Sequence, residues 1–263
     1  MKDALRYEWV RLRTLRSTWW LTGLSLLIAG LLGLSALGLS SNTTLTVVDY
    51  GDLLTGGGLA IFLVAILLSM IGVFATGHEY RYGTIRPTLS ALPRRSAVLA
   101  AKVLVITAYI GVVTLASLVL RYAIAVIILG RRLLDLGLFP APMARVWLGC
   151  VLYTVIFALV GLALAGLFRN IPAAIVTVIV MPLIAENVIR GLLGLHVFHS
   201  IRGLAKALPF SSGAEILRYQ PVDTGGPVGF TTVPSPVDGL LVFLAFLAIV
   251  LGLSWVLFEK RDA

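Results

Sequence analysis

The sequence predicts an all-α, polytopic membrane protein with six membrane-spanning helices. Hydrophobic residues make up 59% of the 263 residues, charged residues make up only 13%, and the mean hydropathy is +1.01. Because soluble domains average about 25% charged residues, this composition excludes an ordinary soluble domain. Six apolar stretches approach or exceed the ~20 residues that a helix needs to cross the ~30 Å hydrocarbon core. We place them at residues 20–39, 59–77, 97–129, 146–168, 172–193 and 237–258.

Composition also narrows the chemistry. The single cysteine, Cys150, excludes an intramolecular disulfide and a cysteine-based metal cluster, and we expect this chain to bind no metal and no cofactor of its own. The net charge of +9 does not indicate nucleic acid, because Lys and Arg of membrane proteins gather on the cytoplasmic side and at anionic headgroups. We therefore expect membrane lipids, and no nucleic acid, as partners of the basic residues.

Residues 1–18 predict a basic amphipathic helix before the first span. Apolar side chains recur along one side of this helix, at Leu5, Trp9, Leu12, Leu15 and Trp19. Arg6, Arg11 and Arg13 fall on the opposite side. This spacing favours an interfacial helix that lies in the headgroup plane over a plain basic flank.

The segment between the first two spans, residues 40–58, carries Asp49 and Asp52 but no Lys or Arg. We expect a loop on the outer side of the membrane, with a flexible turn at the glycines 56–58. No Lys-Ser or Lys-Thr follows these glycines, so they do not form a phosphate-binding loop.

A polar segment, residues 78–96, separates the second and third spans. We expect a helix exit around Gly83-Thr84, a short helix over 84–91 that Pro93 stops, and a new helix from about Ser96. Another protein can grip such a helix from outside the bilayer. We expect Glu79, at the start of this segment, to cap a helix or to form a salt bridge with the interfacial helix.

The third span carries Arg121, which we expect near the outer boundary with its side chain snorkelling to the headgroups. The alternative is a buried, functional charge. Residues 130–145 form the next outer loop, whose arginines oppose the positive-inside trend and whose role the sequence leaves open. The overall distribution of Lys and Arg still predicts that both termini lie in the cytoplasm. We expect a multi-pass protein of the plasma (inner) membrane.

The fifth span contains Pro182 and three polar residues, Glu186, Asn187 and Arg190. An ionisable residue within a span marks a functional site or a helix interface. Because Glu186 and Arg190 are four residues apart, they can pair on one helix face. A place on a substrate pathway and a structural pair at an interface are equal alternatives, and Pro182 predicts a kink.

Residues 194–236 are too apolar for a loose loop and too polar for a seventh span. We expect two short helices, at about 196–207 and 211–219, that enter the outer leaflet and return, followed by irregular chain. Pro209 and Phe210 lie where the two helices meet, and we expect them at an outer gate.

The junction between the second and third spans resembles the cytoplasmic junction of ABC-2 type transporter permeases. The matching elements are Glu79, Gly83-Thr84, the turn from Leu89 to Ala91, Pro93, Arg94-Arg95 and Lys102. The basic start, the six spans, Leu208-Pro209-Phe210-Ser211 and the ending Phe258 to Asp262 agree in layout.

This resemblance implies a coupling helix that sits in a cleft of a separate ATPase subunit. The residues that would make the contact are Glu79, Gly83, Thr84, Arg86, Leu89, Pro93, Arg94 and Arg95. Arg94 and Arg95 would meet acidic groups of the ATPase or lipid phosphates, unless they are topology signals only. The resemblance further implies two ATPases, which bind ATP and Mg²⁺, and two permeases, identical or homologous, with re-entry of the segment between spans five and six.

The chain by itself is then expected to be no enzyme. It has no Gly-rich loop ending in Lys-Ser or Lys-Thr and no extramembrane segment long enough for a nucleotide-binding domain. The resemblance implies export of an amphipathic or hydrophobic substrate, such as a drug, an antibiotic or a lipid-like molecule, out of the cytoplasm or the inner leaflet. The identity of the substrate stays open.

Three other classes also stay open. An intramembrane metalloprotease would use Glu186, His196 and His199, but zinc chemistry needs three protein ligands and a base, and this stretch offers a single Glu. A secondary carrier would need coupling carboxylates deep in the spans, where only Glu186 lies. A membrane scaffold or sensor has no specific sign in the sequence.

Overall fold

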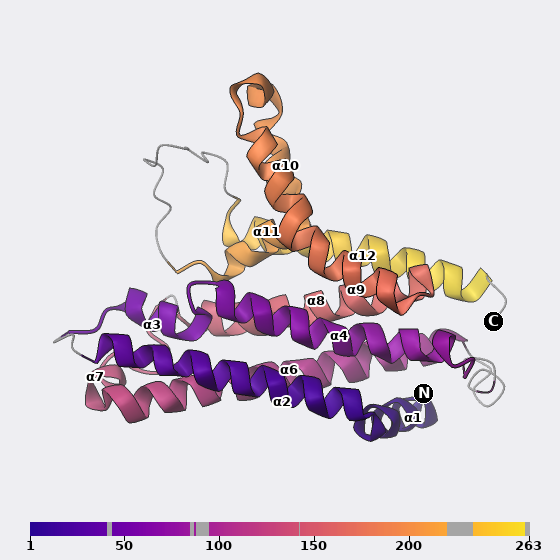
Figure 1. Cartoon of the computed structure of the whole chain (residues 1–263), viewed down its shortest axis with the longest axis horizontal. Coiled ribbons are helices and arrows are strands. Elements are labelled where there is room, and N and C mark those ends of the chain that lie inside the picture. Colours follow the sequence, from indigo (N-terminus) through magenta and orange to yellow (C-terminus); the bar gives the residue numbers. More distant parts are fainter. Residues whose placement is uncertain (41–43, 85–86, 88–94, 142, 220–233, 261–263) are drawn as a thin grey trace.

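The computed structural model describes residues 1–40, 44–84, 87, 95–141, 143–219 and 234–260, without the side chains of 95, 196–200 and 202. Within these ranges every regular element is a helix (Figure 1). Among the described residues, six helical segments are long and apolar enough to cross a membrane: Arg16–Leu39, Val47–Arg81, Ser96–Leu129, Met143–Phe168, Ile171–Leu193 and Pro236–Lys260. The predicted all-α class with six apolar helices is therefore confirmed.

The α-helices are α1 (Lys2–Thr14), α2 (Arg16–Gly33), α3 (Val47–Thr55), α4 (Leu59–Arg81), α6 (Arg95–Leu129), α7 (Arg131–Leu134), α8 (Met143–Phe168), α9 (Ile171–Val180), α10 (Glu186–Leu193), α11 (Pro209–Gly213) and α12 (Pro236–Lys260). Three 3₁₀ segments, η1 (Leu34–Leu39), η3 (His196–Ala207) and η4 (Ala214–Leu217), and one π-helical segment, η2 (Met181–Ala185), complete the described elements.

Helix α8 lies at the centre of the bundle and packs against α4, α6 and α12. Its contact with α4 is close because both helices place glycine there. A Cβ atom at Gly72 would lie 2.0 Å from the carbonyl oxygen of Ala158, and one at Gly161 would lie 2.7 Å from that of Ser69. Small residues that bring two backbones together are typical of helix pairs in membranes, where apolar burial provides little drive.

The long helices α2, α4, α6, α8 and α12 run along the long axis of the molecule (Figure 1). Helix α1 lies at one end of this bundle, which we call the α1 end, and α3 and α7 lie at the other, which we call the α3 end. Helix α4 ends at Arg81 and α6 begins at Arg95 at the α1 end.

The fifth span is not a straight helix. Pro182 lies in η2, a π-helical turn between α9 and α10, and α10 then rises away from the long helices (Figure 1). A π turn and a proline both interrupt the regular hydrogen-bond ladder and are common causes of a sharp bend. The kink that the sequence predicts at Pro182 is therefore present.

The segment between the first two spans is not simply a loop, as the sequence analysis expected. Residues 47–55 form α3, which begins with a capping box: Thr46 Oγ1 accepts a hydrogen bond from Asp49 N at 3.2 Å, and Asp49 Oδ2 accepts one from Thr46 N at 2.7 Å. The helix ends at Gly56, whose φ of 60° suits glycine. The predicted turn at 56–58 is confirmed, since all three glycines have positive φ.

Candidate functional site

Four charged side chains form a cluster at the α1 end, which we call the four-charge cluster. It consists of Glu8 and Arg11 from α1, Glu79 from α4 and Lys102 from α6. Lys102 Nζ lies 2.6 Å from Glu8 Oε1 and 2.7 Å from Glu79 Oε1. Arg11 Nη1 lies 3.1 Å from Glu8 Oε2 and 2.5 Å from Glu79 Oε1.

Three members of the four-charge cluster are buried, Arg11 is half-buried, and the four charges balance. Glu79 and Lys102 are each 1% exposed, and two carboxylates face two cations. The carbonyl oxygen of Ala75 accepts a further hydrogen bond from Arg11 and one from Lys102. Burial raises the pKa of the Glu8 carboxyl above its ordinary value, and the charges of Lys102 and Arg11 act against this rise. Removing one partner of such a cluster would leave an uncompensated buried charge.

The four-charge cluster connects three helices, α1, α4 and α6, at the α1 end. Glu79 precedes the segment between α4 and α6, and Lys102 follows it, so the cluster ties both flanks of that segment to α1. The salt bridge between Glu79 and the first helix, one of two roles expected for this residue, is present. The sequence analysis missed Glu8, although its spacing of three from Arg11 on one helix was a usable signal.

The predicted coupling residues lie partly outside the described structure. Gly83 is described, and its φ of 65° marks the end of α4 as expected. Thr84 lies in the turn that follows. Arg95 opens α6, but its side chain is not described. Four further predicted residues fall outside the described residues: Arg86, Leu89, Pro93 and Arg94.

In the fifth span, Glu186 does not form the expected pair with Arg190. It is 1% exposed, and its carboxylate accepts hydrogen bonds from Phe210 N at 2.9 Å, from Ser211 N at 2.6 Å and from the Ser211 hydroxyl. Among the described residues no ion pair joins Glu186 to Arg190. The N-cap residue of α11, Leu208, has no side-chain acceptor for the first N–H groups of this helix. The carboxylate of Glu186 accepts these hydrogen bonds instead, as an N-cap side chain would.

The two other polar residues of the expected pathway have local roles in the structure. Asn187 donates to the carbonyl oxygens of Pro182 and Leu183 at 3.2 and 2.9 Å, which satisfies acceptors near the π turn. Arg190 is half-buried and lies near Glu215. Burial raises the pKa of the Glu215 carboxyl above its ordinary value, and the charges of Arg218 and Arg190 act against this rise.

The residues expected at an outer gate are held firmly. Pro209 opens α11, and Phe210 is buried among aromatic rings of α8 and α12. The ring centroids of Phe157, Phe243 and Phe246 lie 4.9, 5.4 and 5.7 Å from that of Phe210. Helix α11 is therefore fixed by a carboxylate on one side and by ring packing on the other.

Arg121 does not snorkel to the surface, so the preferred expectation was wrong. It is 2% exposed, and neither Nε nor Nη2 has a hydrogen-bond partner within the described part of the chain. A Cβ atom at Gly56 would lie 3.1 Å from Nη2, which places the guanidinium beside the C-terminal end of α3. The negative end of a helix dipole stabilises a cation there.

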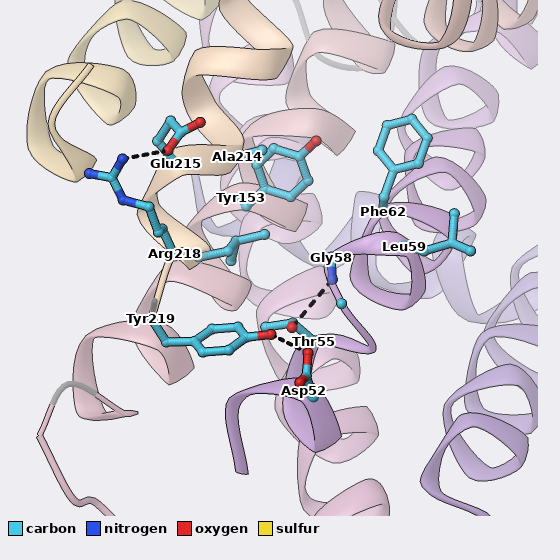
Figure 2. A pocket seen from close by; sticks show the side chains of 12 residues that line it. Asp52, Thr55, Gly58, Leu59, Phe62, Tyr153, Ala214, Glu215, Arg218 and Tyr219 are labelled. Carbon is cyan, nitrogen blue, oxygen red and sulfur yellow. Dashed lines mark hydrogen bonds and ion pairs between the residues drawn. The ribbon is translucent and has the colours of Figure 1, made fainter. Parts of the chain in front are cut away.

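A cavity of about 700 Å³, which we call the outer cavity, opens near the α3 end (Figure 2). The sequence analysis did not foresee it, because its walls come from three separate parts of the chain, 52–62, 153 and 214–219. It is lined by Asp52, Thr55, Gly57, Gly58, Leu59, Phe62, Tyr153, Ala214, Glu215, Leu217, Arg218 and Tyr219.

No group of three or more His, Cys, Asp or Glu that could hold a metal ion occurs among the described residues. The side chains of His196 and His199, which the metalloprotease alternative needs, are not described. Both oxygens of Glu186, the third residue of that alternative, accept hydrogen bonds from α11.

The chain was compared with models of protein families. The model of the family described as "ABC-2 family transporter protein" matches residues 4–184. This range includes all four residues of the four-charge cluster and ends in η2, before Glu186. No curated protein matches the chain.

Proposed function

The chain belongs to the ABC-2 family of transporter membrane proteins, and on this premise we propose that it is the permease subunit of an ATP-driven exporter. Permeases of this family typically lack ATPase activity and generally pair with ATPase subunits. The proposed complex contains two ATPase subunits and two permeases, identical or homologous. Its substrate is an amphipathic or hydrophobic molecule, such as a drug, an antibiotic or a lipid-like compound.

The four-charge cluster is the observation that supports this proposal most directly. In the proposal, the ATPase grips the segment between α4 and α6 through Arg86, Leu89, Pro93, Arg94 and Arg95. Because the cluster bonds both flanks of this segment to α1, a pull on the segment moves the end of α4, the start of α6 and α1 as one unit. Coupling to ATP then requires the two nucleotide states of the ATPase to differ in affinity for the segment.

In the proposed orientation the protein lies in the plasma membrane and its α1 end faces the cytoplasm. Three exposed tryptophans support an interfacial position of α1 and the start of α2: Trp9, Trp19 and Trp20 are 43%, 60% and 79% exposed. Tryptophan favours the membrane–water interface. The α3 end then faces the outer side of the membrane.

The outer gate is proposed at Pro209 and Phe210 of α11. Glu186 keeps this helix docked, so its role is to hold the gate and not to pair with Arg190. Asn187 and Arg190 stay candidates for the pathway or for the interface with the second permease.

The test of the proposed function is ATP-dependent export by the reconstituted complex. Leu89→Asp should abolish substrate-stimulated ATP hydrolysis while the permease still inserts into the membrane, because a charge replaces an apolar contact with the ATPase. Leu138→Asp is the matched control, since Leu138 is exposed and follows α7, the helix at the α3 end, in the chain. Unchanged hydrolysis in Leu89→Asp would contradict the coupling role, and absence of ATP-dependent transport by the unaltered complex would contradict the function.

A further inference from the structure

Arg121 of α6 brings a positive charge into the interior of the bundle without a negative side chain to balance it. The residue is 2% exposed, and no Asp or Glu of the described ranges forms an ion pair with it. Its titratable neighbour is the thiol of Cys150 on α8, which is also buried. Because a guanidinium stays protonated inside a protein, this charge needs compensation from another group.

The two nitrogen atoms of Arg121 that lack a partner lie on the same edge of the planar guanidinium. They are Nε and Nη2, and within the described part of the chain neither donates a hydrogen bond. The N–H bonds of this edge are parallel, and they form the fork with which arginine holds an anion at two points. A buried N–H group nearly always has an acceptor, because leaving it unpaired costs its desolvation.

The end of α3 compensates only part of the charge of Arg121. Gly56, the C-cap of α3, lies beside Nη2, since a Cβ atom there would be 3.1 Å from that nitrogen. The C-terminal end of a helix is equivalent to about half a negative charge, whereas the guanidinium carries a whole positive one. A water molecule would accept the two hydrogen bonds and leave the remaining charge in place. An anion would supply both the acceptor and the missing charge.

We propose that the guanidinium of Arg121 binds a small monovalent anion, such as chloride, between Nε and Nη2. The ligand has to be small because the helices around Arg121 are closely packed. A Cβ atom at Gly33 of α2 would lie 3.4 Å from Arg121 Cα, and one at Gly56 would lie 2.4 Å from Ala60 Cβ. This inference goes beyond the proposed function and does not rest on it, since it involves neither the ATPase nor a transported substrate.

The outer cavity provides a route for such an ion from the α3 end. Gly56, beside the guanidinium, is followed directly by Gly57 and Gly58, which line the cavity (Figure 2). All three glycines have positive φ, a conformation that glycine adopts without strain. A turn of glycines carries no side chain that would block an ion. A shift of its backbone would therefore let a small anion pass and would still exclude a large one.

The experiment measures the unfolding temperature of the purified permease in a neutral detergent while sodium chloride replaces sodium gluconate at constant sodium concentration. We expect a saturable rise of about 3 °C, because a ligand that binds only the folded state stabilises it by mass action. Sodium bromide should act as chloride does. Sodium sulfate should not, since sulfate is larger, divalent and strongly hydrated.

A lipid phosphate is the other source of negative charge near a membrane protein, and a separate measurement excludes it. Phosphatidylglycerol added to the sample in gluconate should not raise the unfolding temperature as chloride does, because its headgroup is too large to pass the glycine turn.

Three variants assign the response to the guanidinium. Arg121→Met should abolish the rise with chloride, and this readout is a difference within one variant, so it does not depend on the variant's own stability. Arg131→Met is the matched control: it removes an exposed cation of α7, also at the α3 end, and should keep the full rise. Arg121→Lys keeps the charge but replaces the two-point edge by one ammonium. It should need about tenfold more chloride for half of the rise.

The proposal is overturned if chloride leaves the unfolding temperature of the unaltered protein unchanged, or if Arg121→Met responds to chloride as the unaltered protein does. A rise with phosphatidylglycerol and none with chloride would overturn it as well, because a lipid phosphate would then be the anion. Each of these results leaves the proposed function intact, since that function is tested by ATP-dependent export of the complete complex.

Discussion

The buried charges at the two ends of the bundle differ in how well they are paired. At the α1 end, two carboxylates and two cations form four ion pairs among Glu8, Arg11, Glu79 and Lys102. At the α3 end, the guanidinium of Arg121 is buried with two nitrogen atoms unpartnered among the described residues. The four-charge cluster is thus closed and balanced in charge, whereas the guanidinium of Arg121 keeps unfilled bonding capacity.

This difference matches the different tasks proposed for the two ends. A region that transmits a displacement must move as one piece, and a satisfied, buried ionic cluster resists separation because each charge would be left alone. A region that accepts a ligand needs groups whose best partner is not yet in the protein. The three variants below test this contrast, from the largest expected effect to the smallest.

Lys102→Met should destabilise the protein most. It leaves Glu8 and Glu79 buried with only Arg11 between them, and breaking a buried pair costs about 3–5 kcal/mol. Thermal unfolding in mild detergent measures the loss. Lys260→Met, at an exposed position near the end of α12, is the control and should change little. Equal losses in both variants would mean that the cluster does not hold the α1 end together.

Glu186→Gln should have an intermediate effect that is confined to α11. A charged acceptor of two backbone N–H groups becomes a neutral one, which costs about 1.5–3 kcal/mol. Hydrogen exchange of the amides of Phe210 and Ser211 should accelerate, while exchange in the middle of α8 stays slow. Asn187→Ala, the neighbouring exposed position, is the control. If exchange at α11 stays as slow as in the unaltered protein, the ring packing of Phe210 alone holds the gate.

Arg121→Met should cost least and can even stabilise the protein. It removes the same sign of charge from the same helix as Lys102→Met, but from a place where the guanidinium lacks a carboxylate partner. Exchanging a buried charge for an apolar side chain of similar length is often neutral or stabilising by about 1–4 kcal/mol. The measurement is the unfolding temperature of Arg121→Met and of Lys102→Met under the same conditions. A fall as large as that of Lys102→Met would contradict the contrast between the two ends.

The sequence predicted local features well because their causes are local. The break at Pro182 follows from a missing backbone N–H, and the turn at 56–58 follows from three glycines. The short helix over 196–207 was also foreseen. Helix α3 was missed although Thr46 and Asp49 form a capping box, because the search for spans treated a short polar segment as a loop.

The candidate sites were harder to predict than the elements that carry them. Spacing on one helix suggested a pair of Glu186 with Arg190, but a backbone 24 residues away from Glu186 offered two N–H groups in a better direction. The prediction for Arg121 used only its position along the third span. That position does not specify which neighbouring helices cover its side chain.

By itself the sequence determined the class of this protein, because apolar composition and helix length are set by the solvent in which the chain must fold. It also determined the bend at Pro182 and the turn at 56–58. Only the tertiary structure decided which charges meet. Lys102 and Glu8 are 94 positions apart, and neither periodicity nor composition specifies which faces of three helices pack together. Their contact depends on how the whole bundle closes, which no single stretch encodes.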